Sequence, residues 1–258
     1  MRDGPDLQEP AGSEGELREL RRSYHDGIAK LRAKTISIVE NAARATEHAT
    51  RILTDQAEDP SSRIAVLVSE TSAQVAEVDG EVLLLLALQA PVARDLRVIL
   101  ASRDIAQIGD LCLGLDHTLA RRIGGAGGVL SLPMKDSLFE IGLSTSRLLL
   151  QANGSWTTLD EEQAEEVAVE ARQSRQAQRE FLAAVVGLPQ LPVDAGVDLG
   201  MVTRVYERLT DHSLEIAARV LFAANGTPAG TSRMPASSSG GLSAAITLAW
   251  EGLAGRLD

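Results

Sequence analysis

The sequence predicts an all-α protein made of two tandem three-helix-bundle repeats, six helices in all, related by a pseudo-two-fold axis. The stretch RDIAQIGDLCLGLDHTLARRI from Arg103 aligns with RVYERLTDHSLEIAARVLFAA from Arg204, and the copies share apolar positions and one acid, Asp110 and Asp211. Self-similarity at a long period is typical of a supersecondary unit that packs on its copy. The low aromatic content of 3%, with abundant Ala, Leu, Glu and Arg, favours helices. Pro, Gly and Asn recur where the six helices would start or stop.

The first repeat is predicted over residues 13–124, after a disordered N-terminal tail of residues 1–12 rich in Pro, Gly and acid. Ser13 and Glu16 have the spacing of a capping box, which predicts a helix start. Apolar and small residues then recur in steps of four and three, which is the spacing of a helix stripe that packs on neighbours. The stripe consists of Ile28, Leu31, Thr35, Ile38, Ala42, Ala45, Ala49 and Ile52.

The second and third helices of this repeat are delimited by prolines. Asp59 with Pro60 predicts the start of a helix that runs to about Gln89. Pro91 interrupts the pattern and opens a helix that runs to about Ile123. A Gly-rich linker, residues 125–132, follows.

The second repeat is predicted over residues 133–225, with Pro133 opening its first helix and Asn153 with Gly154 ending it. Thr158 and Glu161 predict a capping box for the next helix, which Gly187 and Pro189 close, and Trp156 is expected to pack in the intervening loop. The last helix is predicted from about Asp194 to Ala224, with Asn225 and Gly226 terminating it.

Residues 226–258 are predicted to be a flexible C-terminal tail with a short amphipathic helix. Residues 227–241, TPAGTSRMPASSSGG, are too poor in apolar residues to fold. The apolar residues that follow lie on one helix face, namely Leu242, Ile246, Trp250, Leu253 and Leu257. This segment either docks weakly or stays mobile, or it is a peptide dedicated to a partner.

The net charge and composition of the chain argue against several classes of function. The net charge of −11 argues against a nucleic-acid partner and favours a basic or cationic one. The N-terminus lacks the apolar core of a signal peptide, so we expect a cytoplasmic protein. The longest apolar run, VLLLLAL from Val82 to Leu88, is far shorter than the about 20 residues of a membrane span and is expected to be a buried helix turn. Cys112 is the only cysteine and is expected to be a buried apolar residue.

Three acids of the last helix form the candidate site. Glu207, Asp211 and Glu215 are spaced by four and therefore share one helix face. Because like charges at this spacing repel, and because carboxylates suit hard cations, the column is a candidate cation site. The spacing alone favours the alternative, a solvated face of salt bridges, in which Arg204, Arg208 and His212 form the adjacent column and Glu215 pairs with Arg219.

Two motifs in this chain resemble the PhoU family. LLLLALQAPVARDLRVILASRDIAQIGDLC, from Leu83 to Cys112, resembles the family's first-repeat signature, and VTRVYERLTDHSLEIAARVLF, from Val202 to Phe222, resembles its second copy. The resemblance extends over residues 14–226 and implies six helices in two repeats. It also implies a cytoplasmic accessory regulator of phosphate uptake and homeostasis that represses phosphate-starvation genes.

The resemblance further implies partners for such a regulator. They are the ATPase subunit of a phosphate ABC transporter, a phosphate sensor histidine kinase and a second copy of the chain, so that the membrane is reached only through partners. Some family members bind iron or zinc clusters through E/D-x-x-x-D motifs. The resemblance thus implies iron or zinc, or Mg or Mn, at Glu207 and Asp211 in the acidic face of repeat two, with Asp110 in repeat one, where Ala106 replaces the glutamate.

The partner-binding residues are expected to be Glu215 on the acidic face, and Arg94, Asp95 and Arg97 at the family's inter-helix corner. For the corner, the alternative is a cap and salt bridge that fix the turn. Asp104 and Asp116 are expected to be solvated, and His25, His48 and His117 to lie on the surface.

No enzyme class fits the sequence. None of the histidines stands in the Glu-x-x-His motif of di-metal carboxylate proteins, and there is no phosphate loop or nucleophile elbow. We therefore expect a non-enzyme, and the alternative to a phosphate regulator is a helical scaffold of the same fold.

Overall fold

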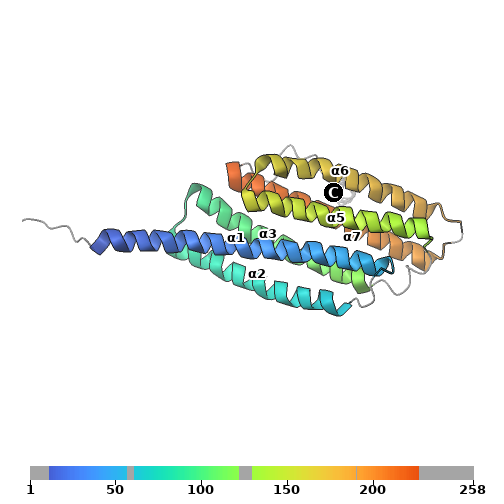
Figure 1. Cartoon of the computed structure of the whole chain (residues 1–258), viewed down its shortest axis with the longest axis horizontal. Coiled ribbons are helices and arrows are strands. Elements are labelled where there is room, and N and C mark those ends of the chain that lie inside the picture. The colour runs from blue at the N-terminus through green and yellow to red at the C-terminus, as the bar shows by residue number, and fades with distance from the viewer. Residues whose placement is uncertain (1–11, 57–60, 122–129, 190, 227–258) are drawn as a thin grey trace, which may run out of the picture.

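The structure, a computed structural model, describes residues 12–56, 61–121, 130–189 and 191–226. These residues form an elongated bundle of six helices and no strand (Figure 1). In chain order the helices are α1 Gly12–Leu53, α2 Ser61–Gln89, α3 Ala93–Arg121, α5 Leu132–Thr158, α6 Glu161–Val186 and α7 Val193–Asn225.

The six helices pack as two groups of three. Helix α1 contacts both α2 and α3, and α7 contacts both α5 and α6. The groups meet where α1 lies against α5 and where α3 lies against α7. Each of these interfaces joins helices in equivalent positions of the two repeats, as a pseudo-two-fold arrangement requires. The predicted all-α class is confirmed.

The apolar stripe of α1 is the centre of the core. Seven of its eight residues are at most 5% exposed, from Leu31 to Ile52, and Ile28 is partly buried. A helix buried against three neighbours needs apolar or small residues at this spacing, and the sequence supplies them. The first turns of α1 extend beyond the bundle and are exposed (Figure 1).

Two glycines allow helices to approach closely at these contacts. A Cβ on Gly142 of α5 would lie 2.1 Å from the Thr50 Oγ1 of α1. A Cβ on Gly109 of α3 would lie 2.4 Å from the Cγ2 of Ile38. Both distances are far inside van der Waals contact, so any larger residue forces α1 away from its neighbour.

Helix α5 is longer than predicted. Asn153 does not end it, because its side chain turns inward and donates a 3.1 Å hydrogen bond to the Ile36 carbonyl of α1. Trp156 is not in a loop but is a fully buried helical residue. The cap of α6 is Asp160, which accepts from the Gln163 backbone at 3.1 Å, while the Thr158 hydroxyl donates to Gly154 within α5.

Two expectations about burial are wrong. Within Val82–Leu88, only Val82 is buried, whereas Leu83, Leu84 and Leu88 are 68%, 58% and 68% exposed. Conversely, Asp116 is fully buried rather than solvated. The side chain lies between α3 and α1, where the Thr46 hydroxyl is 3.1 Å from its Oδ2. Cys112 is buried, as expected.

Several predicted features lie outside the described residues. They are the N-terminal tail, the Asp59–Pro60 helix start, most of the Gly-rich linker and the C-terminal tail with its amphipathic segment. Across the ranges that are described, no helix combines the length and the hydropathy that crossing a membrane requires.

Candidate functional site

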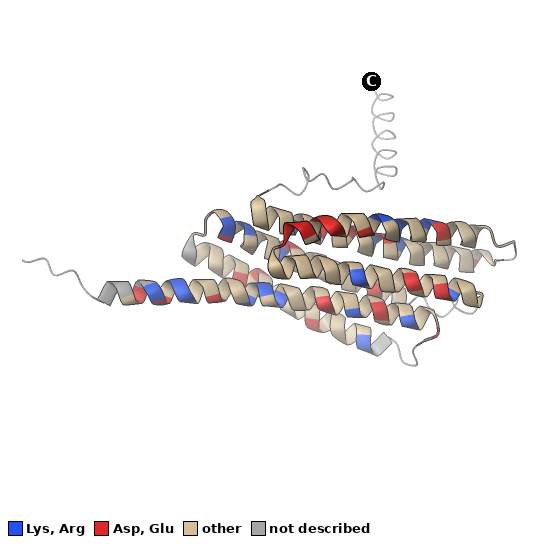
Figure 2. Cartoon of the chain, turned by 45° about the horizontal axis from the view of Figure 1, so that its top comes forward, with Lys and Arg blue, Asp and Glu red and all other residues tan. Residues whose placement is uncertain are grey.

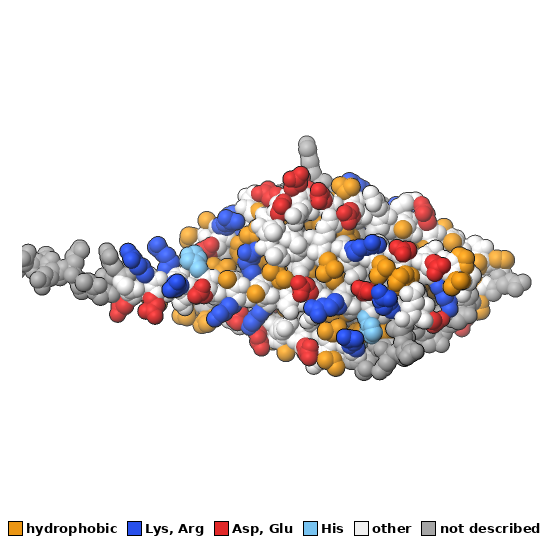
Figure 3. Space-filling model, viewed as in Figure 1, with side chains coloured by type: hydrophobic (Ala, Val, Ile, Leu, Met, Phe, Trp, Pro, Cys, Tyr) orange, Lys and Arg blue, Asp and Glu red, His pale blue; other side chains and the backbone are white. Residues whose placement is uncertain are grey.

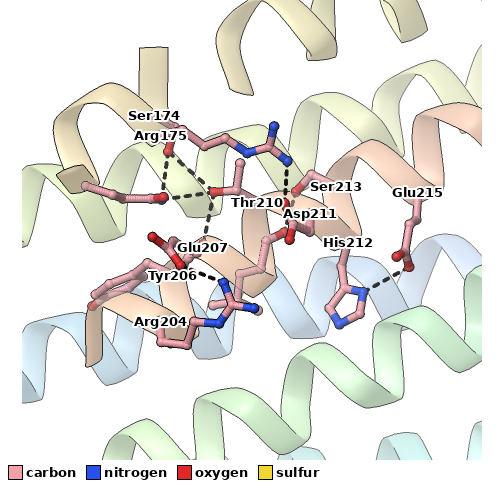
Figure 4. A network of polar contacts seen from close by, with 12 residues as sticks. Ser174, Arg175, Arg204, Tyr206, Glu207, Thr210, Asp211, His212, Ser213 and Glu215 are labelled. Atoms are coloured by element: carbon pink, nitrogen blue, oxygen red, sulfur yellow. Dashed lines mark hydrogen bonds and ion pairs between the residues drawn. The ribbon is translucent and has the colours of Figure 1, made fainter. Parts of the chain in front are cut away.

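Each acid of the α7 column has its own cationic or histidine partner. The Arg204 Nη1 donates to Glu207 at 2.7 Å, and the His212 Nδ1 lies 3.0 Å from Glu215 (Figure 4). The Arg175 guanidinium of α6 donates to the Asp211 carboxylate. The column is therefore a series of ion pairs and polar contacts, as the alternative interpretation of its spacing predicts.

The Arg175–Asp211 pair is the most enclosed of these contacts. The Arg175 side chain is 13% exposed and that of Asp211 is 27% exposed. Behind the pair, the Gln178 amide donates to the Ser174 and Thr210 hydroxyls at 3.1 and 3.0 Å in the buried contact between α6 and α7. Because α6 and α7 pack along their length, Arg175 is held over Asp211.

The surroundings of Glu215 favour the ionised form of its carboxyl group. The pKa of its carboxyl is lowered, mainly by the hydrogen bond from His212 and further by the positive charges of Arg219 and Arg208. Its side chain is 54% exposed, so this charge is available at the surface. The predicted ion pair between Glu215 and Arg219 is wrong, because the Arg219 Nε lies 3.0 Å from the carboxylate of Asp104 on α3. Asp104 is therefore paired with Arg219 in the structure.

The first repeat differs from the second at the equivalent positions. Asp110 accepts a 2.9 Å hydrogen bond from the Ser72 hydroxyl of α2. Arg103 reaches Asp79 of α2 at 3.1 Å. Ala106 is fully buried in an apolar cluster that also contains Leu31, Ile38, Val78, Val82 and Ile99. A glutamate at this position would be desolvated without a partner, which gives the replacement a structural reason.

These carboxylates, as arranged, do not fit a multinuclear metal cluster. Such a cluster needs several carboxylates converging on one point. Here Asp211 is paired with Arg175 and Glu207 is paired with Arg204. In the other repeat, Asp110 accepts a hydrogen bond from Ser72. No group of three His, Cys, Asp or Glu side chains is placed to hold a metal within the described ranges. The metal site at Glu207 and Asp211 stays a prediction.

The α2–α3 corner connects the two repeats. The Arg97 guanidinium lies at the end of α7, 3.5 Å from the Ala224 carbonyl oxygen. The pKa of Tyr24 on α1 is raised by burial and then by Asp95, and that of Arg32 is lowered by burial and then by Arg94. Arg94 and Asp95 therefore face α1, while Arg97 faces the α7 terminus, where cations are favourable.

An acidic surface on α6, missed by the sequence interpretation, is the densest charge cluster of the described chain (Figure 2). Its members are all exposed, namely Glu161, Glu162, Glu165, Glu166 and Glu170. Among the residues with described positions, Glu162, Glu165 and Glu166 form no ion pair. The signal was present in the sequence as glutamates four apart, EExxEExxxE, from Glu161 to Glu170.

The chain is similar to known proteins, although no family model matches it. The chain is 28% identical over 213 residues to "Phosphate-specific transport system accessory protein PhoU homolog 1" of Mycobacterium leprae, covering 81% of this chain and 95% of that protein. It is also 28% identical over 228 residues to PhoU homolog 2 of Mycobacterium tuberculosis, covering 80% and 99%.

Solved structures show the same fold. The crystal structure of PhoU from Pseudomonas aeruginosa superposes with a TM-score of 0.72 at 18% identity, covering 79% of this chain and all of that one. The resemblance to the PhoU family is confirmed. The PhoU structure from Streptococcus pneumoniae gives a TM-score of 0.69 at 15% identity, covering 79% and 97%. In this PhoU fold the first motif runs from the end of α2 into α3 and the second lies on α7, and α3 and α7 pack against one another at the junction of the repeats.

Proposed function

We propose that this chain is an accessory protein of a phosphate transport system. The observation that carries the proposal is the similarity to PhoU homologues along about four fifths of the chain. The role is regulatory and non-catalytic. The protein acts in the cytoplasm, binds the transporter's ATPase subunit and a sensor histidine kinase, and represses phosphate-starvation genes when phosphate is abundant.

The acidic surface of α6 supports an adaptor of this kind. Of its glutamates, Glu162, Glu165 and Glu166 are exposed to solvent, whereas Glu207 and Asp211 of α7 are held by neighbouring arginines. A surface with unpaired charge of one sign attracts a basic patch on a partner and speeds encounter. We therefore assign partner capture chiefly to α6, with Glu215 as the ionised contact contributed by α7.

Charge reversal tests the role of this surface. Glu165→Lys with Glu166→Lys is expected to reduce capture of the ATPase subunit about tenfold or more at low salt, because attraction becomes repulsion. The matched control is Glu16→Lys with Glu70→Lys, which changes the net charge equally at exposed sites on α1 and α2. Equal capture by both double variants would remove α6 from the proposal.

A cellular experiment tests the regulatory role itself. Deletion of the gene is expected to raise transcription of phosphate-starvation genes at high phosphate, and the wild-type gene restores repression. If expression at high and low phosphate is unchanged by the deletion, the chain is a helical scaffold without this role, which is the second candidate function.

We further propose a homodimer through the exposed leucines of α2. Leu84 and Leu88 share a helix face and are 58% and 68% exposed. Contiguous exposed apolar side chains mark interaction surfaces. Leu84→Ser with Leu88→Ser is expected to yield a monomer by light scattering. The control, Leu111→Ser with Leu150→Ser, changes exposed leucines elsewhere and leaves a dimer.

A further inference from the structure

A groove of about 850 Å³ opens between α5 and α6 on the surface of the second repeat. Small side chains from both helices leave it open, namely Ser137, Ser144, Ser174, Ala177 and Ala184. The larger apolar side chains that border it, Ile141, Leu148 and Phe181, are at most 4% exposed and belong to the core. The surface of the groove is therefore mostly small and polar, so an occupant does not need to bury a large apolar face.

Both rims of the groove are acidic. Asp136 and Glu140 line it from α5, and Glu170 and Glu180 line it from α6. Among the described lining residues, Arg147 is the single basic one. It lies 3.8 Å from Glu140, but the two side chains are 68% and 70% exposed, so this pair neutralises little of the rim. Acidic side chains are also visible along the edge of the molecule that α6 forms (Figure 3).

The register of α5 and α6 brings two of these acids opposite one another. The helices run antiparallel (Figure 1), and the Gln151 amide of α5 donates to Glu170 of α6 at 3.1 Å. Glu140 precedes Gln151 by about the same number of residues as Glu180 follows Glu170, so Glu140 and Glu180 face each other across the groove. Like charges in this position repel, and a cation placed between them is favourable.

The acidic surface of α6 continues directly into the groove. Steps of three and four residues connect Glu162, Glu166, Glu170, Gln173, Ala177, Glu180 and Ala184 on one face of α6. The first part of this stripe belongs to the acidic surface, and the part from Glu170 onward is the α6 wall of the groove. From Glu162 to Ala184 the stripe is about 33 Å long. A single elongated element of a partner is therefore able to contact the surface and the groove together.

We propose that the α5–α6 groove binds a basic helix of a partner protein, which lies lengthwise in it. Lysine or arginine side chains three and four residues apart share one face of such a helix. Their methylene stems cover Ala177 and Ala184, and their charged ends reach Glu140 and Glu180 at one end and Glu170 at the other. This inference rests on the proposed partner-binding role of α6 and specifies the shape of the bound element, a helix in a groove instead of a flat basic patch.

Filling the groove without changing its charge tests this proposal. Ala184 is exposed and lines the groove, so Ala184→Phe is expected to reduce capture of the ATPase subunit about fivefold or more at low salt. Ala183→Phe is the matched control, because Ala183 is equally exposed on α6 but does not line the groove. Ser137→Phe, at an exposed lining position of α5, repeats the test if Ala184→Phe fails to fold. Equal capture by the lining variants and the control overturns the groove as the binding site.

A synthetic helix tests the groove without the transporter. The probe is a labelled alanine peptide of about 16 residues with four lysines on one helix face, and its control has the same composition with the lysines spread around the helix. By fluorescence anisotropy, the full chain is expected to bind the probe about fivefold more tightly than the control.

Glu140→Gln with Glu180→Gln should abolish this preference, whereas Glu16→Gln with Glu70→Gln, which removes equal charge at exposed sites elsewhere, should keep it. Equal binding of the two peptides by the wild type overturns the inference, even if the ATPase subunit is captured. A clear preference for the probe without capture of the ATPase subunit supports the groove and instead removes that subunit from the proposed function.

Discussion

The indole Nε1 of Trp156 on α5 donates a 2.9 Å hydrogen bond to the Thr35 hydroxyl of α1, and both side chains are fully buried. The Arg32 guanidinium lies 5.1 Å from the centre of the indole ring and donates to the Trp156 carbonyl at 2.7 Å. One residue of the second repeat is thus held by two residues of the first through a hydrogen bond, a cation–π contact and a backbone contact.

Trp156→Ala is expected to lower the free energy of unfolding by about 3–5 kcal/mol, because it removes a large buried side chain and leaves a cavity between the repeats. Guanidinium denaturation followed by circular dichroism measures the loss. Val186→Ala, at the exposed end of α6 with 79% of the residue accessible, is the control and should change stability by less than about 0.5 kcal/mol. A loss below about 1 kcal/mol for Trp156→Ala contradicts the packing described.

Gly142→Ala is expected to destabilise the protein by about 1–3 kcal/mol, because the new methyl group meets Thr50 of α1 at the crossing with α5. Gly154→Ala in the same helix is the matched control. A Cβ there has 3.8 Å to its nearest neighbour, so this change should stabilise by about 1 kcal/mol through helix propensity. Thermal melts of both variants give the comparison, and melting shifts of the same sign would contradict it.

Asp116→Asn tests the buried carboxyl of α3. Burial raises the pKa of Asp116 well above its ordinary value, and the hydrogen bond from the Thr46 hydroxyl offsets only part of this effect. The folded state therefore keeps a proton that the unfolded state releases. Stability contributed by this group is full below about pH 4 and falls as pH rises toward the folded pKa.

The neutral amide that this substitution introduces removes that dependence. The free energy of unfolding of Asp116→Asn, relative to wild type, is expected to increase steadily as pH is raised from about 4. Urea denaturation at a series of pH values measures it. Parallel stability curves for the two proteins would show that the carboxyl is ionised in the fold.

Arg175→Met tests the link between the ion pairs and metal. Removing the guanidinium frees the Asp211 carboxylate beside Glu207, so zinc uptake should rise in the variant. Elemental analysis of protein purified without a tag or chelator is the measurement, and wild type is expected to hold less than about a tenth of an equivalent. Arg179→Met, at an exposed arginine one turn along α6, is the control. A wild-type protein with stoichiometric iron or zinc would instead establish the metal site.

Features set by local spacing were predictable from the sequence. The stripe of α1, the start of α3 near Pro91, and the end of α6 at Gly187 depend on residues close in the chain. The failures all depend on what a residue packs against. Asn153 and Gly154 are typical helix terminators, yet Asn153 finds a carbonyl partner on α1 and the helix continues.

The partners of the α7 acids could not be predicted from the sequence for the same reason. Spacing showed that Glu207, Asp211 and Glu215 share a face, but not that α6 brings Arg175 onto Asp211. Asp116 lies on α3 among alternating polar and apolar residues, and nothing local distinguishes its buried position from an exposed one. Only the crossing of α1 over α3 determines it.

The contacts of α1 with α5 and of α3 with α7 are those of an isologous dimer made from one three-helix unit. A single ancestral unit would have had to find its twin in solution, with an occupancy that falls on dilution. Joining both copies in one chain makes that association intramolecular and therefore independent of expression level. It also freed the copies to diverge, so that one could bury alanine where the other displays glutamate.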